Sequence, residues 1–166
     1  MRIARIETHV CHARMRNWIF VKVLTDEDGL YGWGEATLEW HTRAVVGAIE
    51  DLATLVVGED PTRIEHLWRI MYNGSRFPGG SILNAAISGI ELALWDILGK
   101  HLGVPVWQLL GGSVRESLRT YTHLGLGDMR AVYESSSSAA IIEHARRVTQ
   151  AGYEALKVVC IPYSHY

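Results

Sequence analysis

The chain has 166 residues, of which 48% are hydrophobic and 20% charged, and a formal net charge of −2 at pH 7. This length suits one ordinary domain, or one small domain with part of another. The globular composition and interspersed charges argue against disorder, a nucleic-acid partner and a membrane partner. Because Cys11 and Cys160 lie far apart and no leader-like apolar stretch opens the chain, we expect a cytoplasmic protein with reduced thiols.

The first 36 residues predict a three-stranded antiparallel meander. Residues 2–10 alternate apolar with charged side chains, and residues 18–26 are rich in aromatic and β-branched side chains. Asp28 and Gly29 predict a hairpin turn before a returning strand over residues 30–36.

Three helical patterns follow the predicted sheet. Apolar residues recur at three- and four-residue spacing over Thr42–Val57, and Gly58 is expected to close this helix. Asp60 and Pro61 predict the start of a second helix. Ser81 is the predicted N-cap of a third, long and apolar helix.

The third helix carries two further signals. Ser88 and Gly89 are small enough to let another backbone approach closely. Asp96 and Lys100 are four residues apart on one face and are expected to form an ion pair, and Glu91 is expected to be structural.

The pattern changes near residue 112. Residues 118–126 predict a strand, residues 139–153 an amphipathic helix with Ser138 as N-cap, and residues 154–161 a second strand. A strand–helix–strand unit of this kind predicts a parallel pair. Because parallel sheets are normally covered on both faces, we expect this segment to begin a larger domain, completed in a longer parent chain or covered by a partner.

Three segments carry a resemblance to a known family: "TDEDGLYGWGEA", "GEDPTRIEHLW" and "ISGIELALWDILGKHLGVPVWQLLGG". They resemble the N-terminal capping domain of the enolase superfamily, in its mandelate racemase/muconate lactonizing branch. The resemblance implies an α+β capping domain over residues 1–112, a three-stranded antiparallel meander plus helices. It implies that residues 113–166 supply the first strand, helix and second strand of an incomplete (β/α) TIM-like barrel.

The resemblance also implies the chemistry. Members bind Mg²⁺ through carboxylates and remove the proton α to a substrate carboxylate, which gives an ene-diolate. The Mg²⁺ ligands and the His–Asp base pair are expected beyond residue 166, and an even-numbered homo-oligomer is expected.

One family motif falls inside this chain. Where racemases and cycloisomerases of the branch carry Lys-x-Lys, this sequence has Lys157, Val158 and Val159. Loss of the second lysine favours an acid-sugar dehydratase, which converts an aldonate into a 2-keto-3-deoxy acid, over a racemase, epimerase or cycloisomerase. A different alternative is a truncated, non-catalytic capping fragment that binds a partner.

Three residues near the C-terminus are catalytic candidates. Lys157 lies in an apolar strand, where an unpaired charge is costly, so we expect it to contact a substrate carboxylate or a metal ligand. The alternative is a lysine that faces water at the end of the strand. Tyr163 and His165 follow on the side where barrels place their active sites, and either a catalytic role or an ordinary loop position fits them.

Two loops of the capping domain supply candidate substrate-binding residues. The loop over residues 12–17 corresponds to one that closes over substrate in the family, and it offers Arg14 and Arg16 to a carboxylate or hydroxyl. The stretch over residues 35–43 corresponds to a second specificity loop and offers Trp40 and His41. The alternative for each is a solvated surface side chain.

The short stretch "HVCH" over residues 9–12 has the composition of a zinc site. On an extended strand, however, His9 and Cys11 point to one face and His12 to the other, so three ligands do not converge. We therefore predict no zinc site there.

Overall fold

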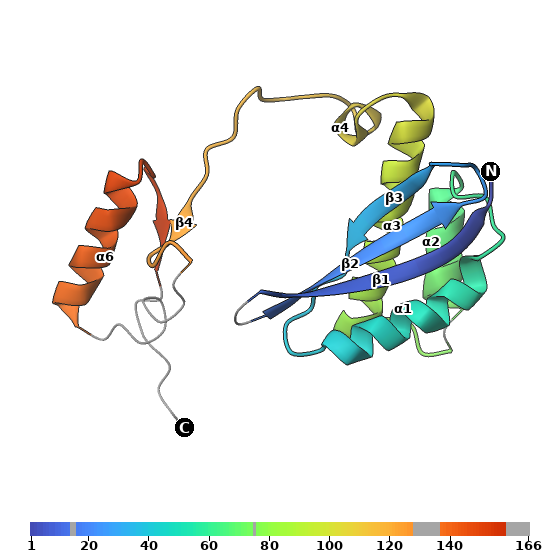
Figure 1. Cartoon of the computed structure of the whole chain (residues 1–166), viewed down its shortest axis with the longest axis horizontal. Coiled ribbons are helices and arrows are strands. Elements are labelled where there is room, and N and C mark those ends of the chain that lie inside the picture. The colour runs from blue at the N-terminus through green and yellow to red at the C-terminus, as the bar shows by residue number, and fades with distance from the viewer. Residues whose placement is uncertain (14–15, 75, 128–136, 159–166) are drawn as a thin grey trace. The chain divides into compact units, whose positions relative to one another are not determined.

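A computed structural model describes residues 1–13, 16–74, 76–127 and 137–158. The chain divides into two compact units, Met1–Ser113 and Val114–Tyr166, here called the first unit and the second unit. The first unit holds a three-stranded antiparallel sheet with helices, and the second holds a parallel strand pair with a helix (Figure 1). The predicted fold class, an α+β cap followed by the start of a barrel, is confirmed.

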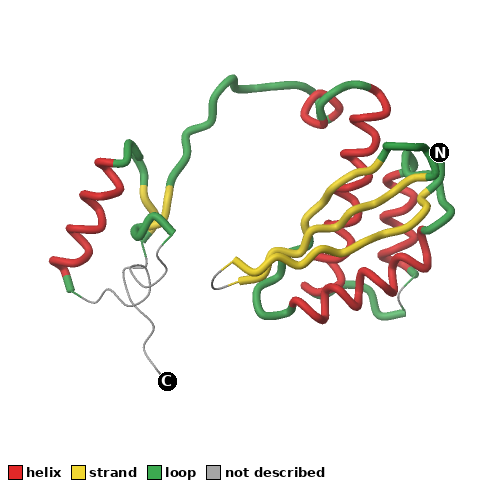
Figure 2. Tube along the Cα trace, viewed as in Figure 1, coloured by secondary structure: helices red, strands yellow, loops and turns green. Residues whose placement is uncertain are grey.

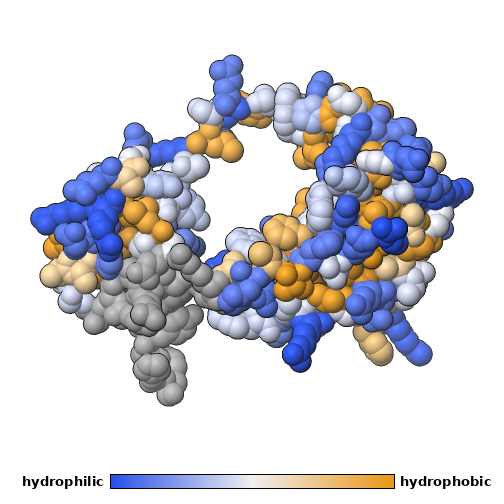
Figure 3. Space-filling view, viewed as in Figure 1, coloured by the Kyte–Doolittle hydropathy of each residue, from blue (hydrophilic) through white to orange (hydrophobic). Residues whose placement is uncertain are grey.

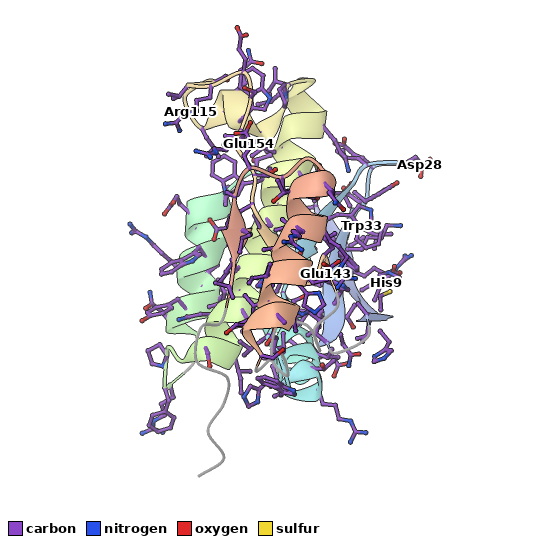
Figure 4. All side chains as sticks on the ribbon, turned by 90° about the vertical axis from the view of Figure 1, so that its left-hand side faces the viewer. His9, Asp28, Trp33, Arg115, Glu143 and Glu154 are labelled. Carbon is purple, nitrogen blue, oxygen red and sulfur yellow. The ribbon has the colours of Figure 1, made fainter. Side chains whose placement is uncertain are left out.

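The sheet of the first unit consists of β1 (Ile3–Ala13), β2 (Arg16–Thr25) and β3 (Tyr31–Glu35), in that order and antiparallel throughout. Alternate side chains of β2 point inward, and the inward ones are fully buried: Ile19, Val21 and Val23. The predicted turn joins β2 to β3, with Gly29 at a φ of 76° and Asp28 at its exposed tip (Figure 4).

The described residues of the first unit also form four helices: α1 (Thr42–Val56), α2 (Ile64–Asn73), α3 (Ser81–Leu102) and the short α4 (Val106–Leu109). The buried face of α1 follows the predicted spacing: Val45, Ile49, Leu52 and Val56. In Figure 2 the long helix α3 runs behind the three yellow strands.

Two predicted helix starts are wrong by a few residues. The second helix begins at Ile64 because the Asp60 carboxylate accepts hydrogen bonds from the Thr62 amide (2.9 Å) and hydroxyl (2.8 Å), which hold residues 60–62 in a turn. The N-cap of α3 is Gly80, with a φ of 85°, and not Ser81, which is the first helical residue.

Strand β3 packs against α3 almost backbone to backbone. A Cβ atom added at Gly32 would lie 1.9 Å from the Ala93 carbonyl oxygen, and one added at Gly34 would lie 2.0 Å from the Gly89 carbonyl oxygen. A Cβ atom on Gly89 would meet Ala36 Cβ at 2.6 Å. The predicted close approach at Gly89 is therefore confirmed, whereas Ser88 is exposed.

Two charged side chains of α3 cover the free edge of β3. The Trp33 amide donates to Asp96 Oδ2 (2.8 Å), and Lys100 Nζ donates to the Tyr31 carbonyl (2.8 Å). Lys100 Nζ also lies 2.7 Å from Asp96 Oδ2, so the predicted ion pair is confirmed. The pair additionally fastens the helix to the strand, a role that the i,i+4 spacing alone does not reveal.

Helix α3 is long and apolar enough to cross a membrane when judged by length and composition among the described helices. Eight of its residues are buried, and they lie against the sheet and against α1 and α2. Within the first unit it is the core helix, as its nearly continuous apolar cover predicts.

The outer face of the sheet carries aromatic and cationic side chains. Lys22 Nζ lies 4.2 Å from the ring centre of Tyr31 and 5.4 Å from that of Trp33, and His9 stacks obliquely on Trp33 at 5.3 Å. His9 and Trp33 project from the same side of the sheet (Figure 4). Hydrophobic and hydrophilic residues are therefore mixed on the surface of this unit (Figure 3).

The second unit contains β4 (Thr122–His123), α6 (Ser138–Gln150) and β5 (Leu156–Lys157). The strands pair in parallel, as predicted, with Thr122 opposite Leu156 and His123 opposite Lys157.

The strands of the second unit are shorter than predicted. The amide of Leu126 donates to the His123 carbonyl (3.0 Å), which turns the chain directly after β4, and Leu126 has a φ of 51°. The part of the second predicted strand from residue 159 on lies outside the described residues. The N-cap of α6 is Ser137, whose hydroxyl accepts from the Ala140 amide at 3.2 Å, so the predicted cap at Ser138 is wrong by one residue.

The packing of β3 on α3 generates a stability prediction. Gly34→Ala places a methyl group on the Gly89 carbonyl and should lower the free energy of unfolding by about 3 kcal/mol, measured by urea denaturation. The matched control is Gly47→Ala in the middle of α1, where an added Cβ meets nothing within 4 Å. It should raise the free energy of unfolding by about 0.5–1 kcal/mol. Equal effects of the two substitutions would contradict the close packing.

The turn at residues 60–62 generates a pH prediction. Hydrogen bonds from the amide and then the hydroxyl of Thr62 favour the ionised carboxylate and lower the pKa of Asp60 below its ordinary value of 3.8. The stabilisation is therefore present above pH 3.8 and is lost as the pH falls below it. Asp60→Asn should reduce the loss of unfolding free energy between pH 7 and acid, measured by urea denaturation across pH. For Thr62→Val, the loss of unfolding free energy between pH 7 and acid should lie between those of the wild type and Asp60→Asn. An unchanged pH dependence in both variants would refute the role of the Asp60 carboxylate in this turn.

Candidate functional site

The two predicted substrate-binding loops meet in the structure. Arg16, at the start of β2, places a guanidinium nitrogen 2.9 Å from Glu39 Oε1 in the stretch over residues 35–43. Both side chains are about one-third exposed, at 32% and 35%. The Arg16 guanidinium also lies 6.0 Å from the ring centre of Trp18. Sequence spacing did not predict this pairing, because 23 residues separate the two partners.

Asn17 adds a second link between the loops. Its Oδ1 lies 3.0 Å from His12 Nδ1, and its amide nitrogen donates to the Thr42 hydroxyl at 3.2 Å. A further bond runs from the Ile19 amide to the Thr37 hydroxyl (3.0 Å). The end of the β1–β2 hairpin is thus tied to the segment that leads into α1.

Trp40 and His41 lie at the exposed end of that segment. Trp40 is 81% exposed and has a φ of 63°, a left-handed conformation that is uncommon and costly for a bulky side chain. His41 immediately precedes α1, and its carbonyl accepts the first helical bond, from Val45 at 3.0 Å. Its side chain is exposed and does not cap the helix. Both side chains are available to a ligand at this loop.

In the second unit, His123 and Lys157 lie opposite each other at the carboxyl ends of β4 and β5. The Leu124 amide donates to the Lys157 carbonyl at 3.0 Å, which fixes the register. Side chains at this end of parallel strands form the binding edge of barrels and α/β sheets. Lys157 is exposed in the described part of the chain, and its contact with a substrate carboxylate or a metal ligand stays a prediction.

His123 is a site residue that the sequence analysis missed. Its Nδ1 atom is buried and has no hydrogen-bond partner in the described part of the chain. A buried polar atom without a partner is costly and marks a place where a ligand can bind. The available signal was a histidine inside the strand predicted over residues 118–126, one strand away from Lys157.

Three predicted site residues, Arg14, Tyr163 and His165, lie outside the described residues. Of the remaining four, Arg16, Trp40 and His41 belong to the loops of the first unit, and Lys157 belongs to the second. The described site residues therefore fall into two sets, one in each unit.

Metal-ligating side chains do not gather within residues 1–13, 16–74, 76–127 and 137–158: no group of three or more His, Cys, Asp or Glu residues lies together there. The described residues therefore do not fit a Mg²⁺ site by themselves. His9, from the zinc-like stretch, packs on Trp33 instead.

Two hollows lie away from the predicted site residues. A groove of about 700 Å³ in the first unit is mostly apolar and is lined by β3, α3 and α4, with Trp33, Leu92, Trp95 and Leu110 among its walls. A smaller hollow of about 330 Å³ in the second unit lies before the two strands, beside Arg119 and Glu154. Neither contains Arg16, Trp40, His41 or Lys157.

Known proteins resemble this chain in sequence. A D-galactonate dehydratase from Xanthomonas campestris pv. campestris (strain B100) is 44% identical over 167 residues, covering 91% of this chain and 43% of the relative. A D-galactonate dehydratase from Xanthomonas oryzae pv. oryzae (strain PXO99A) is 52% identical over 125 residues, covering 75% of this chain and 32% of the relative. The chain thus spans less than half the length of these relatives.

Solved structures resemble it as well. An enolase from Pantoea ananatis with bound D-gluconate and Mg has a TM-score of 0.84 and 33% identity, covering 95% of this chain and 36% of that one. A putative galactarate dehydratase from Agrobacterium radiobacter with bound Na and L-malate has a TM-score of 0.79 and 33% identity, covering 95% and 38%.

A match to a protein-family model assigns the chain to a family. Residues 3–111 match the N-terminal domain of the mandelate racemase / muconate lactonizing enzyme family, which is more than half of the chain. The chain therefore belongs to the mandelate racemase / muconate lactonizing enzyme family and carries its N-terminal domain.

Proposed function

We propose that this chain is the N-terminal part of a sugar-acid dehydratase that acts on an aldonate. The observation that carries the proposal is the 44% identity with D-galactonate dehydratase over 91% of the chain. The solved relative with bound D-gluconate and Mg supports the same substrate class. The protein is expected to be a cytoplasmic homo-oligomer, and residues 113–166 are the start of its barrel.

The proposed reaction removes water from the acid. A base takes the proton from C2, the C3–O bond breaks, and hydroxide leaves with a proton as water. The resulting enol becomes a 2-keto-3-deoxy acid. Mg²⁺ would stabilise negative charge on the substrate carboxylate during proton removal. Its ligands are not among the described residues, so only binding and orientation of the acid are assigned to this chain.

Lys157 is assigned to the substrate carboxylate. An ammonium group at the carboxyl end of β5 presents a positive charge at the edge where barrels bind substrate. His123 lies opposite Lys157 on the neighbouring strand and is assigned to the same edge. Valine at position 159 cannot remove a proton, so the base is expected elsewhere in the longer protein.

The loops of the first unit are assigned to binding hydroxyl groups of the acid. Arg16 lies at the end of the β1–β2 hairpin, and Trp40 and His41 lie in the segment that leads into α1. The Arg16–Glu39 pair and the bond from Asn17 to Thr42 join the two segments. Polar donors next to an exposed aromatic ring suit a chain of hydroxyl groups. Arg14, Tyr163 and His165 remain predicted contacts.

The test uses the full-length protein with Mg²⁺ and a panel of aldonates, with 2-keto acid formation as the readout. Lys157→Met should lower kcat/KM about 10²–10³-fold, because one preorganised charge contributes that much to many active sites. Arg146→Met removes an exposed cation from α6 and is the matched control, expected within twofold of wild type.

Proton NMR in D₂O separates the proposed reaction from its alternatives. Loss of water with deuterium at C3 of the product supports a dehydratase. Exchange at C2 with inversion and no keto acid would identify a racemase and overturn the proposal. A decrease of less than tenfold for Lys157→Met would overturn the role of that residue.

A further inference from the structure

We propose that the free edge of β1 pairs with β1 of a second copy of this chain, antiparallel and about a twofold axis at Thr8. Such pairing joins two three-stranded sheets into one continuous sheet. The proposal names a surface for the homo-oligomer expected above and uses residues of the first unit alone. It does not depend on the proposed reaction.

The two edges of the sheet differ. Side chains of α3 occupy the edge of β3, whereas β1 is the other outer strand and is 11 residues long (Figure 1). Within the described residues, only Ile3 has backbone partners on the outer edge of β1. Its amide donates to the Glu59 carbonyl (2.9 Å), and its carbonyl accepts from the Gly58 amide (2.8 Å). A long uncovered edge is a place where another strand can add.

The backbone groups on this edge can be identified from the pairing of β2. The Ile19 carbonyl accepts from the Ala36 amide at 2.8 Å and so faces the side of β3. Because backbone direction alternates along a strand, the even-numbered residues of β2 face β1, where they lie opposite odd-numbered residues from Arg5 to Cys11. The amides and carbonyls that point to the free edge therefore belong to the even-numbered residues of β1: Ile6, Thr8 and Val10.

Charge distinguishes the registers in which two such edges can pair. With the twofold axis at Thr8, Glu7 lies opposite the partner's His9, and the reciprocal pair forms on the other side of the axis. These are positions without backbone bonds between them, where side chains of neighbouring strands approach closest. An axis at Glu7 would instead oppose two carboxylates, and an axis at His9 two imidazoles.

The covered start of β1 limits the pairing at one end. An axis at Ile6 would place the partner's His9 beside Ile3, on the edge that residues 58–59 already occupy. With the axis at Thr8, residues 5–11 pair with residues 11–5 of the second copy, and the paired stretch ends before Ile3. All of these residues lie in the described part of the chain.

The apolar side chains of the strand fit the same register. Val10 is 50% exposed, although it is β-branched and lies in a strand. With the axis at Thr8, it lies opposite the partner's Ile6, which packs partly against the core of its own unit. The two Thr8 residues lie opposite each other, a cross-strand pairing that stabilises sheets. Both faces of the strand are therefore self-complementary.

Glu7 and His9 already belong to a row of polar contacts on the outer face of the sheet. Glu7 Oε1 accepts from Arg5 at 2.7 Å, and Glu7 Oε2 lies 3.6 Å from His9 Nε2 of the same chain. The His9 ring also packs on Trp33. Pairing across the axis thus extends an existing row, and its side chains are held near the positions that the contact requires.

The first test uses disulfide cross-linking of the full-length protein. Thr8→Cys, in a Cys11→Ser background, should form a disulfide-linked dimer under mild oxidation, detected by intact mass and non-reducing electrophoresis. The paired Cα atoms would lie about 5.5 Å apart, within the range that a disulfide spans. The controls are the Cys11→Ser background alone and Glu50→Cys in that background, which places a thiol on the exposed side of α1.

The second test measures self-association by sedimentation over a concentration series. Thr8→Pro removes an amide that points to the free edge and no bond to β2, so it should raise the Kd of the dimer about tenfold or more. Thr8→Val keeps the amide and a β-branched side chain and is the matched control, expected within about twofold of wild type. Urea denaturation checks that each variant unfolds cooperatively.

The outcomes decide the proposal without reference to turnover. A dimer cross-linked through Thr8→Cys above both controls supports it, as does a Kd raised by Thr8→Pro and not by Thr8→Val. A wild type that stays monomeric at every concentration overturns it, and so does a Thr8→Cys protein that cross-links no more than the controls. If Thr8→Pro fails to fold, the cross-linking result alone decides. Failure of the aldonate assay would leave the interface unaffected.

Discussion

The close approach of strand β3 to helix α3 is the constraint on which the first unit depends. Carbonyl groups of the helix occupy the space where side chains of Gly32 and Gly34 would lie, and Gly89 on the helix faces Ala36. Strand and helix approach this closely, and α3 also packs against β2, whose inward side chains are fully buried. Arg16 at the start of β2 and Glu39 beyond the end of β3 meet beside this sheet. The candidate loops of the first unit are thus carried by the same strands that pack on α3.

Most of the first unit could be predicted from the sequence, because its elements have strong periodicity. Alternation identified the first strand, β-branched and aromatic residues the second, and the turn at Asp28 and Gly29 the third. Three- and four-residue spacing identified the first helix, and the spacing of Asp96 and Lys100 identified their ion pair. Element ends were less predictable. The N-cap of α3 is Gly80 and not Ser81. The N-cap of α6 is Ser137, one of four consecutive serines, and the local sequence does not distinguish it from the serines beside it.

The candidate site was predictable only in part, because its contacts join residues distant in sequence. Arg16, Trp40 and His41 were identified from their loops, but the pairing of Arg16 with Glu39 depends on how the sheet closes. His123 looked like an ordinary strand residue until the parallel register placed it opposite Lys157. Lys157 lies at the end of the two-residue strand β5 and is exposed there. Whether a residue of a parallel sheet is buried depends on the neighbouring strands, and the sequence pattern of one segment does not show where those strands lie.

The side chains of Asp96 and Lys100 also affect how readily this small sheet pairs with strands of other molecules. An edge strand with free amide and carbonyl groups invites pairing with a strand of another molecule, which is a common beginning of aggregation. On β3 the Trp33 amide and the Tyr31 carbonyl already have partners from the helix of the same chain. A foreign strand would have to displace two charged groups that also hold each other. An ion pair of modest energy thus also protects the three-stranded sheet from adding a fourth strand at this edge.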